Sequence, residues 1–206
     1  MKLKPLAVSL LSLVAAANVS YGATVTGNGA LTTTDSTFDH PRVTGTLPHY
    51  YDVFQFTVSL TGAYTFELSS MNTTGTPSNA LDTYLLIYAN SFNPLAPTGD
   101  IGFNDDFSGA LTVLGGTGTG FQGAMPASRI ANLNLTAGTT YFMVVTSFRN
   151  TTFVGTGSTA QATGAYNYGI TGPGDINVVP EPGTTALFVM AGGALAGYAF
   201  RKRRRA

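Results

Sequence analysis

The 206-residue sequence contains no cysteine and no tryptophan, and only two histidines. Without cysteine there can be no disulfide, no thiolate metal site and no cysteine nucleophile, so an exported domain of this chain must be held together by its apolar core alone. The absence of tryptophan counts against a sugar-binding platform, although ten tyrosines and thirteen phenylalanines are present.

Positive charge is scarce in the central part of the chain. Residues 24–178 contain three arginines, no lysine and nine acidic residues, which gives a net charge of −6 with histidine neutral. The neutrality of the whole chain therefore comes from its basic ends. A domain with so few cations cannot neutralise phosphates, and we expect no nucleic-acid partner.

The N-terminus has the pattern of a secretory signal. Two lysines precede an apolar stretch, residues 6–17, and small residues follow it. We expect residues 1–22 to form a signal helix that signal peptidase removes after Gly22, with cleavage after Ala23 as the alternative. A retained membrane anchor is disfavoured because the apolar stretch is short.

The C-terminal segment, residues 179–206, combines three features. Pro180, Glu181 and Pro182 precede an uncharged apolar run, residues 184–200, and a basic cluster, residues 201–205. As a helix the run would span ~26 Å, slightly less than the ~30 Å core of a bilayer. We expect a single transmembrane helix with the basic cluster on the cytoplasmic side. A buried core helix is disfavoured because five cations follow directly.

The residues between the two ends predict strands without helices. Short segments rich in aromatic and β-branched residues are separated by clusters of Gly, Pro, Asn and Thr. The pattern predicts a hairpin over residues 51–68, a central strand at 81–88, and further strands at 141–148 and 166–170. We expect one all-β domain at residues 23–171, an antiparallel β-sandwich or jelly roll, with a linker at 172–178.

Oxygen-bearing side chains gather in one predicted loop. Asn104, Asp105 and Asp106 are consecutive, and Asp82 opens the predicted strand that leads towards them. Carboxylate and amide oxygens are the ligands that calcium prefers, so these four residues are a candidate calcium site, although not with EF-hand spacing. The simpler alternative is a turn in which Asn and Asp side chains bond the local backbone.

Other patterns do not favour catalysis or a cofactor other than calcium. His40 and His49 are disfavoured as members of a Ser-His-Asp triad, because no nucleophile elbow is present and both lie beside prolines in a loop-like segment. A zinc site formed by the two histidines with Asp39 is also disfavoured. Residues 118–123 match Gly-x-Gly-x-x-Gly, but Pro126 interrupts the helix that a dinucleotide site needs. Asp105 and Asp106 could form the carboxylate pair of a glycoside hydrolase, but a cluster in a turn is favoured. Glu67 lies in the middle of a predicted strand, and we expect its side chain to face solvent.

The C-terminal segment resembles a PEP-CTERM sorting signal, the address used by Gram-negative bacteria that make exopolysaccharide. The resemblance covers residues 179–205 and rests on Val179-Pro180-Glu181-Pro182, the apolar run and the arginine-rich end. It implies cleavage near Pro180-Glu181-Pro182 by an exosortase, a membrane transpeptidase-like enzyme. It also implies export across the inner membrane, temporary anchoring by the C-terminal helix, and delivery to the cell surface or biofilm matrix.

Most of residues 50–171 are similar to the bacterial pre-peptidase C-terminal domain family, a β-sandwich accessory of secreted proteases and other exported proteins. The similar segments are residues 52–56, 81–88, 104–106, 128–130 and 135–145. In the family the Asn-Asp-Asp turn is followed shortly by the Ser-x-Ile strand, whereas about twenty residues intervene in this chain.

These features together favour an exported, non-enzymatic surface or extracellular-matrix protein with a structural or adhesive role linked to exopolysaccharide. The expected partners are signal peptidase, the exosortase, the membrane before processing, and a polysaccharide. The alternatives are a calcium-dependent carbohydrate-binding module and a secreted hydrolase.

Overall fold

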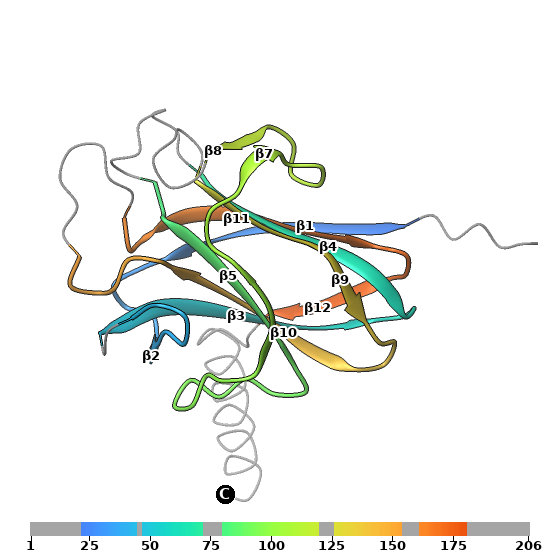
Figure 1. The fold of residues 1–206 in the computed structure, drawn as a ribbon, viewed down its shortest axis with the longest axis horizontal. Coiled ribbons are helices and arrows are strands. Elements are labelled where there is room, and N and C mark those ends of the chain that lie inside the picture. The colour runs from blue at the N-terminus through green and yellow to red at the C-terminus, as the bar shows by residue number, and fades with distance from the viewer. Residues whose placement is uncertain (1–21, 45–46, 72–79, 120–125, 154–160, 181–206) are drawn as a thin grey trace, which may run out of the picture.

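The computed structural model describes residues 22–44, 47–71, 80–119, 126–153 and 161–180 (Figure 1). Within these ranges no helix is long and apolar enough to cross a membrane. The expected transmembrane helix at 184–200 lies outside the described residues, as does the expected signal helix except for Gly22.

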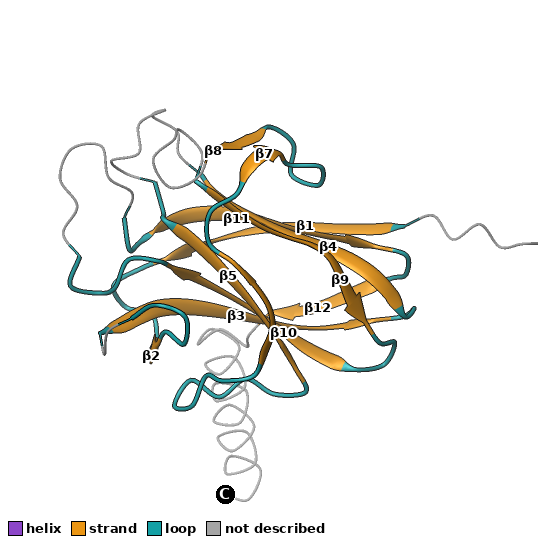
Figure 2. Ribbon diagram, in the orientation of Figure 1, coloured by secondary structure: helices purple, strands orange, loops and turns teal. Residues whose placement is uncertain are grey.

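The described residues form strands and loops without helices, as the sequence predicts (Figure 2). The strands in these ranges are β1 (Ala23–Leu31), β2 (Thr37–Asp39), β3 (Pro48–Val58), β4 (Gly62–Ser70), β5 (Thr83–Ala89), β6 (Asp100–Asn104), β7 (Ser108–Ala110), β8 (Thr117–Thr119), β9 (Ala127–Leu135), β10 (Thr140–Ser147), β11 (Gly164–Gly172) and β12 (Ile176–Pro180).

The strands form two main sheets that pack face to face. One sheet has the order β1-β11-β4-β9, and the other has the order β12-β3-β10-β5-β6 with β2 added beside β3. A separate two-stranded sheet joins β7 to β8. All named strand pairs are antiparallel, which confirms the predicted all-β class with antiparallel sheets.

The core lies between the two sheets because alternate side chains of each strand point to the same face. The Phe56 ring of β3 lies 5.6 Å from the Phe66 ring of β4 across this core and stacks on Tyr141 of β10. The buried core residues are Leu31, Phe56, Val58, Tyr64, Phe66, Leu68, Leu81, Leu85, Ile87, Ile130, Leu135, Tyr141, Met143, Val145, Tyr166, Tyr168, Ile170 and Ile176.

β5 is an interior strand that is buried on both faces, which explains its nearly continuous apolar sequence. Leu85 and Ile87 face the main core. Tyr84, Leu86 and Tyr88 face a second cluster on the outer side of the sheet, where Phe38 of β2 covers them. The Tyr88 hydroxyl donates a hydrogen bond to the Pro97 carbonyl at 3.0 Å, which fixes the following loop over this cluster.

The prediction of a hairpin over residues 51–68 is wrong. β3 and β4 follow each other in the chain, but they belong to different sheets and connect them as an arch. Both arrangements give the same alternation of apolar residues, so the pattern cannot distinguish them. The core pairing of Phe56 with Phe66 favours the arch, because in a hairpin these rings would lie on one face of one sheet.

Part of the segment expected to be a linker is a strand. Residues 176–180 form β12, which pairs with β3 from Ile176 opposite Val58 to Pro180 opposite Phe54. Ile176 is buried, with 7% of its surface exposed. β12 is an edge strand of its sheet, so the folded domain extends to the first proline of the sorting motif.

Candidate functional site

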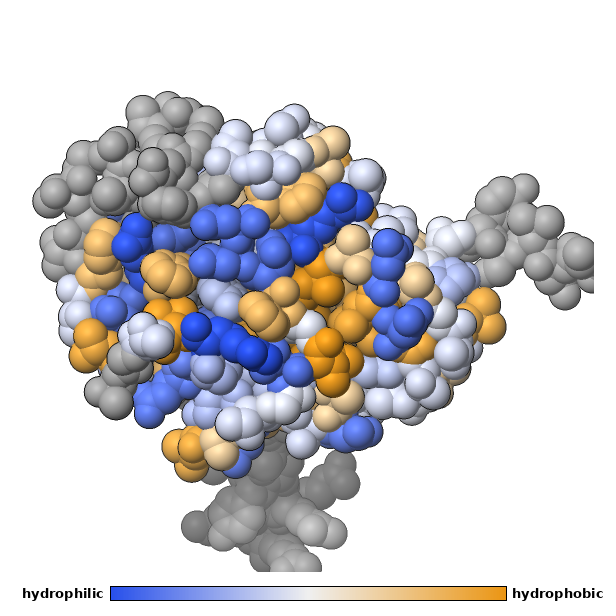
Figure 3. Space-filling model, viewed as in Figure 1, coloured by the Kyte–Doolittle hydropathy of each residue, from blue (hydrophilic) through white to orange (hydrophobic). Residues whose placement is uncertain are grey.

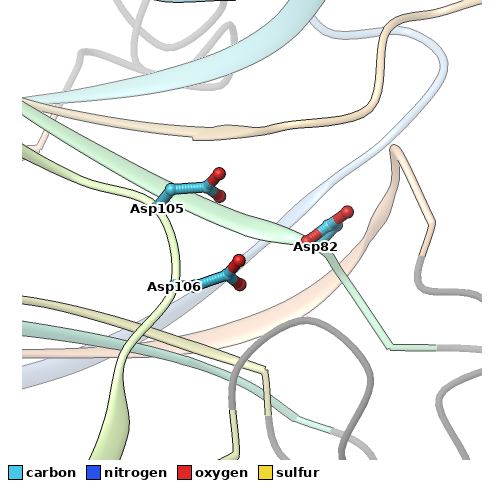
Figure 4. Close-up of side chains that lie close together, drawn as sticks. All are labelled: Asp82, Asp105 and Asp106. Atoms are coloured by element: carbon cyan, nitrogen blue, oxygen red, sulfur yellow. The ribbon is translucent and has the colours of Figure 1, made fainter.

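Three aspartates meet where β5 begins and β6 ends. Asp82 immediately precedes β5, whereas Asp105 and Asp106 immediately follow β6. Because β5 and β6 are antiparallel neighbours, the start of one lies beside the end of the other, and Leu85 pairs with Asn104. Figure 4 shows the carboxylates of Asp105 and Asp106 pointing towards that of Asp82.

The three carboxylates share one small cavity. One oxygen from each lies within 4.8 Å of the others. The cavity has a volume of about 210 Å³ and is lined by Asp82, Asp105, Asp106, Phe148 and Arg149. Arg149 Nε lies 2.8 Å from Asp82 Oδ2, and the Asp82 side chain is only 1% exposed. The site therefore has three carboxylates and one guanidinium.

Burial makes this site unfavourable for negative charge. Desolvation raises the pKa of Asp82 to about 6, against the stabilising charge of Arg149. Desolvation, and then repulsion from Asp106 and Asp82, raises the pKa of Asp105 to about 7. Among the described residues no hydrogen-bond donor reaches the buried Oδ1 atoms of Asp82 and Asp105. Within this part of the chain the Oδ1 atoms of Asp82 and Asp105 thus lack donors, while Arg149 partly balances the charge of Asp82.

Backbone and hydroxyl contacts hold the aspartates in place. The Asp82 N–H donates to the Gln161 carbonyl, and the Asp82 carbonyl accepts from the Phe148 N–H. The buried Ser128 Oγ lies 2.6 Å from the Asp105 carbonyl oxygen and 2.9 Å from that of Thr83. Ser128 of β9 therefore ties the opposite sheet to both strands that carry the site.

Asn104 does not join the three aspartates. Its Oδ1 accepts a hydrogen bond of 2.8 Å from the Arg129 backbone N–H, and Asn104 does not line the cavity. Sequence reasoning missed Arg149 and Ser128 as neighbours of the acidic residues. A signal existed for Arg149, since it is one of three arginines in an acidic domain. Nothing in the sequence marks Ser128 as a contact of Asp105.

His40 and His49 pack against each other as core residues. Their ring centroids are 5.0 Å apart, and both side chains are buried. Burial, and then the charge of His49, lowers the pKa of His40 to about 3. Burial also lowers the pKa of His49. Among the described residues neither histidine belongs to a cluster of three metal-ligating side chains, and Asp39 is exposed.

The prediction that Glu67 faces solvent is wrong. Its side chain is fully buried, and both carboxylate oxygens receive hydrogen bonds. Oε1 accepts from the N–H and hydroxyl of Thr112, and Oε2 accepts from the N–H groups of Val113 and Leu114. Arg129 Nε lies 3.3 Å from Oε1. Glu67 is thus the anion around which the turn after β7 folds.

A larger open groove separates the edge strands β6 and β9. It has a volume of about 670 Å³ and is lined by Arg42, Asp100, Ile101, Gly102, Phe103, Ile130, Ala131, Asn132, Leu133 and Asn134. Arg42 pairs with both oxygens of Asp100, and its guanidinium carbon lies 4.3 Å from the centre of the Phe103 ring. Figure 3 shows apolar residues gathered on this face beside hydrophilic ones.

The backbone of β9 is irregular where it borders the groove. The pairing of β4 with β9 shifts between Tyr64 and Phe66, and Asn132 has a φ of 57°. Such bulges redirect side chains and often occur beside binding sites. By contrast, the Gly-x-Gly-x-x-Gly segment begins in strand β8, whereas a dinucleotide loop leads into a helix.

The comparisons with known proteins concern the C-terminal segment. Residues 178–205 match the family model described as the PEP-CTERM protein-sorting motif. No curated protein matches the chain. The similarity of residues 50–171 to the pre-peptidase C-terminal domain family stays a prediction. Glu181, Pro182 and the apolar run lie outside the described residues, and the match begins at Val178, inside β12. The sorting motif means that the chain is exported, anchored in the membrane before processing, and sorted through an exosortase.

Proposed function

We propose that this chain is a non-enzymatic surface or extracellular-matrix protein with a structural or adhesive role linked to exopolysaccharide. The observation that carries the proposal is the sorting motif, which starts within the last strand of a β-sandwich. Processing at this motif would release the sandwich with every described strand except the end of β12. The exported product is then a compact module, not an extended tail.

The charge and chemistry of the domain support a passive role. Residues 24–178 carry a net charge of −6 from three arginines and nine acidic residues, which keeps a secreted module soluble. Its buried histidine rings pack against each other, and the His40 ring also packs against Tyr84, which favours a structural role for them. The cavity lined by Asp82, Asp105 and Asp106 is small, and its charge is partly neutralised by Arg149.

The sorting part of the proposal is tested by replacing Pro180, Glu181 and Pro182 with alanine in the native host. We expect the full-length protein to accumulate in the membrane fraction, because the exosortase no longer recognises it. Asn177→Ala, an exposed change in β12 upstream of the triplet, is the control and should leave processing intact. Normal processing of the triple variant would reject the assignment.

A carbohydrate-binding module is the second candidate, and the groove between β6 and β9 favours it. Phe103 is 47% exposed there, beside the planar side chains of Arg42, Asn132 and Asn134. Aromatic faces flanked by planar polar groups suit the apolar faces and hydroxyls of sugars. The acidic domain favours a neutral glycan over an anionic one.

Binding of the processed protein to an array of neutral glycans tests this second candidate. Phe103→Ala should abolish a specific signal if the groove binds sugar. Leu95→Ala removes a side chain that is 94% exposed and does not line the groove, so it is the matched control. Binding that survives Phe103→Ala would exclude the groove as the glycan site.

A further inference from the structure

We propose that Asp82, Asp105 and Asp106 bind a calcium ion that links the start of β5 to the end of β6. This inference is independent of the proposed function, which requires no metal. It also revises the ligand set expected from the sequence. Asn104 is excluded because its amide oxygen is bonded to the Arg129 backbone and the residue does not line the cavity.

The spacing of the carboxylates fits a calcium ion. Calcium binds oxygen at 2.3–2.6 Å, so two ligands on opposite sides of the ion are separated by about 5 Å. The three carboxylates each place an oxygen within 4.8 Å of the other two. One ion can therefore contact all three with small adjustments of the side chains.

The second observation is that Asp82 is buried and that its Oδ1 has no hydrogen-bond donor in the described ranges, although Arg149 contacts its Oδ2. The Asp82 side chain is 1% exposed and lines the cavity, and no hydrogen-bond donor among the described residues reaches its Oδ1. The buried Oδ1 of Asp105 likewise receives no hydrogen bond from them. Buried carboxylate oxygens are costly unless a donor or a cation contacts them, and the residues that carry these two oxygens line a cavity with room for a cation.

The charge balance of the cavity calls for a divalent ion. Three ionised aspartates and one arginine leave a charge of −2, and Arg149 contacts Asp82 from one side, 2.8 Å from its Oδ2. A doubly charged cation makes the site neutral. A neutral site of paired charges is far less costly to bury than a site with two excess negative charges.

The size and ligand type favour calcium over magnesium or zinc. The cavity of about 210 Å³ has room for the ion and several waters, each of which occupies roughly 30 Å³ in the liquid. Calcium accepts such an irregular set of six to eight oxygens. Magnesium needs a compact octahedron, and zinc prefers nitrogen or sulfur ligands, which this cavity lacks.

The bound ion would stabilise one end of the sandwich. Asp82 is bonded through its backbone to Phe148 after β10 and to Gln161 before β11. Asp105 is bonded through its carbonyl to Ser128 of β9. An ion shared by Asp82 and Asp105 therefore connects segments of both sheets, in a chain that has no disulfide to do so.

The test is thermal unfolding of the processed protein, purified with EDTA and titrated with calcium chloride. For a dissociation constant of about 10⁻⁴–10⁻³ M, which is typical of extracellular modules, 10 mM calcium should raise Tm by about 5 °C. Magnesium at the same concentration should have less than a third of this effect. An unchanged Tm in calcium would overturn the proposal, and an equal response to magnesium would overturn the choice of calcium.

Variants locate the ion. Asp105→Asn and Asp106→Asn should each weaken calcium binding at least tenfold, and Asp106 is exposed, so its replacement should leave the fold intact. Asp175→Asn, an exposed carboxylate outside the cavity, is the matched control and should keep the full shift. Terbium luminescence, sensitised by tyrosine, gives a second reading in which calcium competes. Undiminished binding in both the Asp105 and Asp106 variants would place the ion elsewhere and reject the site.

Discussion

Replacing Glu67 by glutamine keeps the shape of the side chain and removes its charge. In the wild-type protein the carboxylate accepts four hydrogen bonds from residues 112–114, with donor–acceptor distances of 2.7–3.0 Å. It also pairs with Arg129 at 3.3 Å. A glutamine amide has one oxygen and one NH₂ group, so it can satisfy the donors on one side only.

The expected loss follows from these contacts. Two hydrogen bonds to a buried charged group disappear, each contributing about 1.5–3 kcal/mol, and the amide NH₂ then faces N–H donors. The Arg129 guanidinium loses its buried counter-charge as well. We expect Glu67→Gln to lower the free energy of unfolding by about 4 kcal/mol, a large part of the ~5–15 kcal/mol that holds a typical domain folded.

Urea denaturation of the processed protein, followed by tyrosine fluorescence, measures this change. Asp175→Asn removes an exposed acidic charge and should change the free energy of unfolding by less than about 0.5 kcal/mol. A loss below about 1 kcal/mol for Glu67→Gln would refute the reasoning, since it would mean that the backbone N–H groups of the turn find other partners at little cost.

Two further changes test the core. Burial holds the pKa of His40 at about 3, so the folded state keeps it neutral while the unfolded chain protonates it below pH ~6.5. Stability is therefore lost as the pH falls below 6.5, by about 2 kcal/mol at pH 5. The raised pKa values of Asp82 and Asp105 have the opposite effect on stability as the pH falls. The measurement therefore compares the wild-type protein with His40→Asn, in which only the contribution of His40 is removed. Parallel curves of unfolding free energy between pH 7 and 5 would contradict the lowered pKa of His40. In Gly172→Ala, the added Cβ would overlap the Tyr64 ring, and we expect a loss of about 1–3 kcal/mol in urea denaturation. An unchanged midpoint, equal to that of the exposed control Ala63→Ser, would show that the ring moves freely.

The fold class could be predicted because strand alternation is a local property. The apolar run at residues 81–88 was predicted to be a central strand, and β5 is interior and covered on both faces. By contrast, local sequence does not determine which strands pair with one another. The turns after β3 and β9 could close hairpins or cross between sheets, and only packing of the whole core decides this. Both turns cross between the sheets.

The candidate site could be predicted only in part, because some of its contacts depend on residues far away in the sequence. Asp82 and Asp105 could be associated because adjacent antiparallel strands bring them together. The orientation of Asn104 depends on Arg129 in the opposite sheet, which no local pattern reveals. Glu67 was predicted to face solvent, but it is buried. An isolated acid in a strand is usually exposed, but here the N–H groups of a turn about 45 residues later in the sequence surround it.

The position of β12 limits how far the domain can stand from the membrane. The strand ends at Pro180, and the apolar run begins at Thr184. Four peptide steps cover at most about 14 Å. With the apolar run in the bilayer, the β12–β3 edge must therefore lie almost on the lipid headgroups. An exosortase that works at this depth has little space beside the sandwich, so access to the motif should require the end of β12 to detach from β3. The stability of that single edge strand would then affect how readily the motif becomes available to the exosortase.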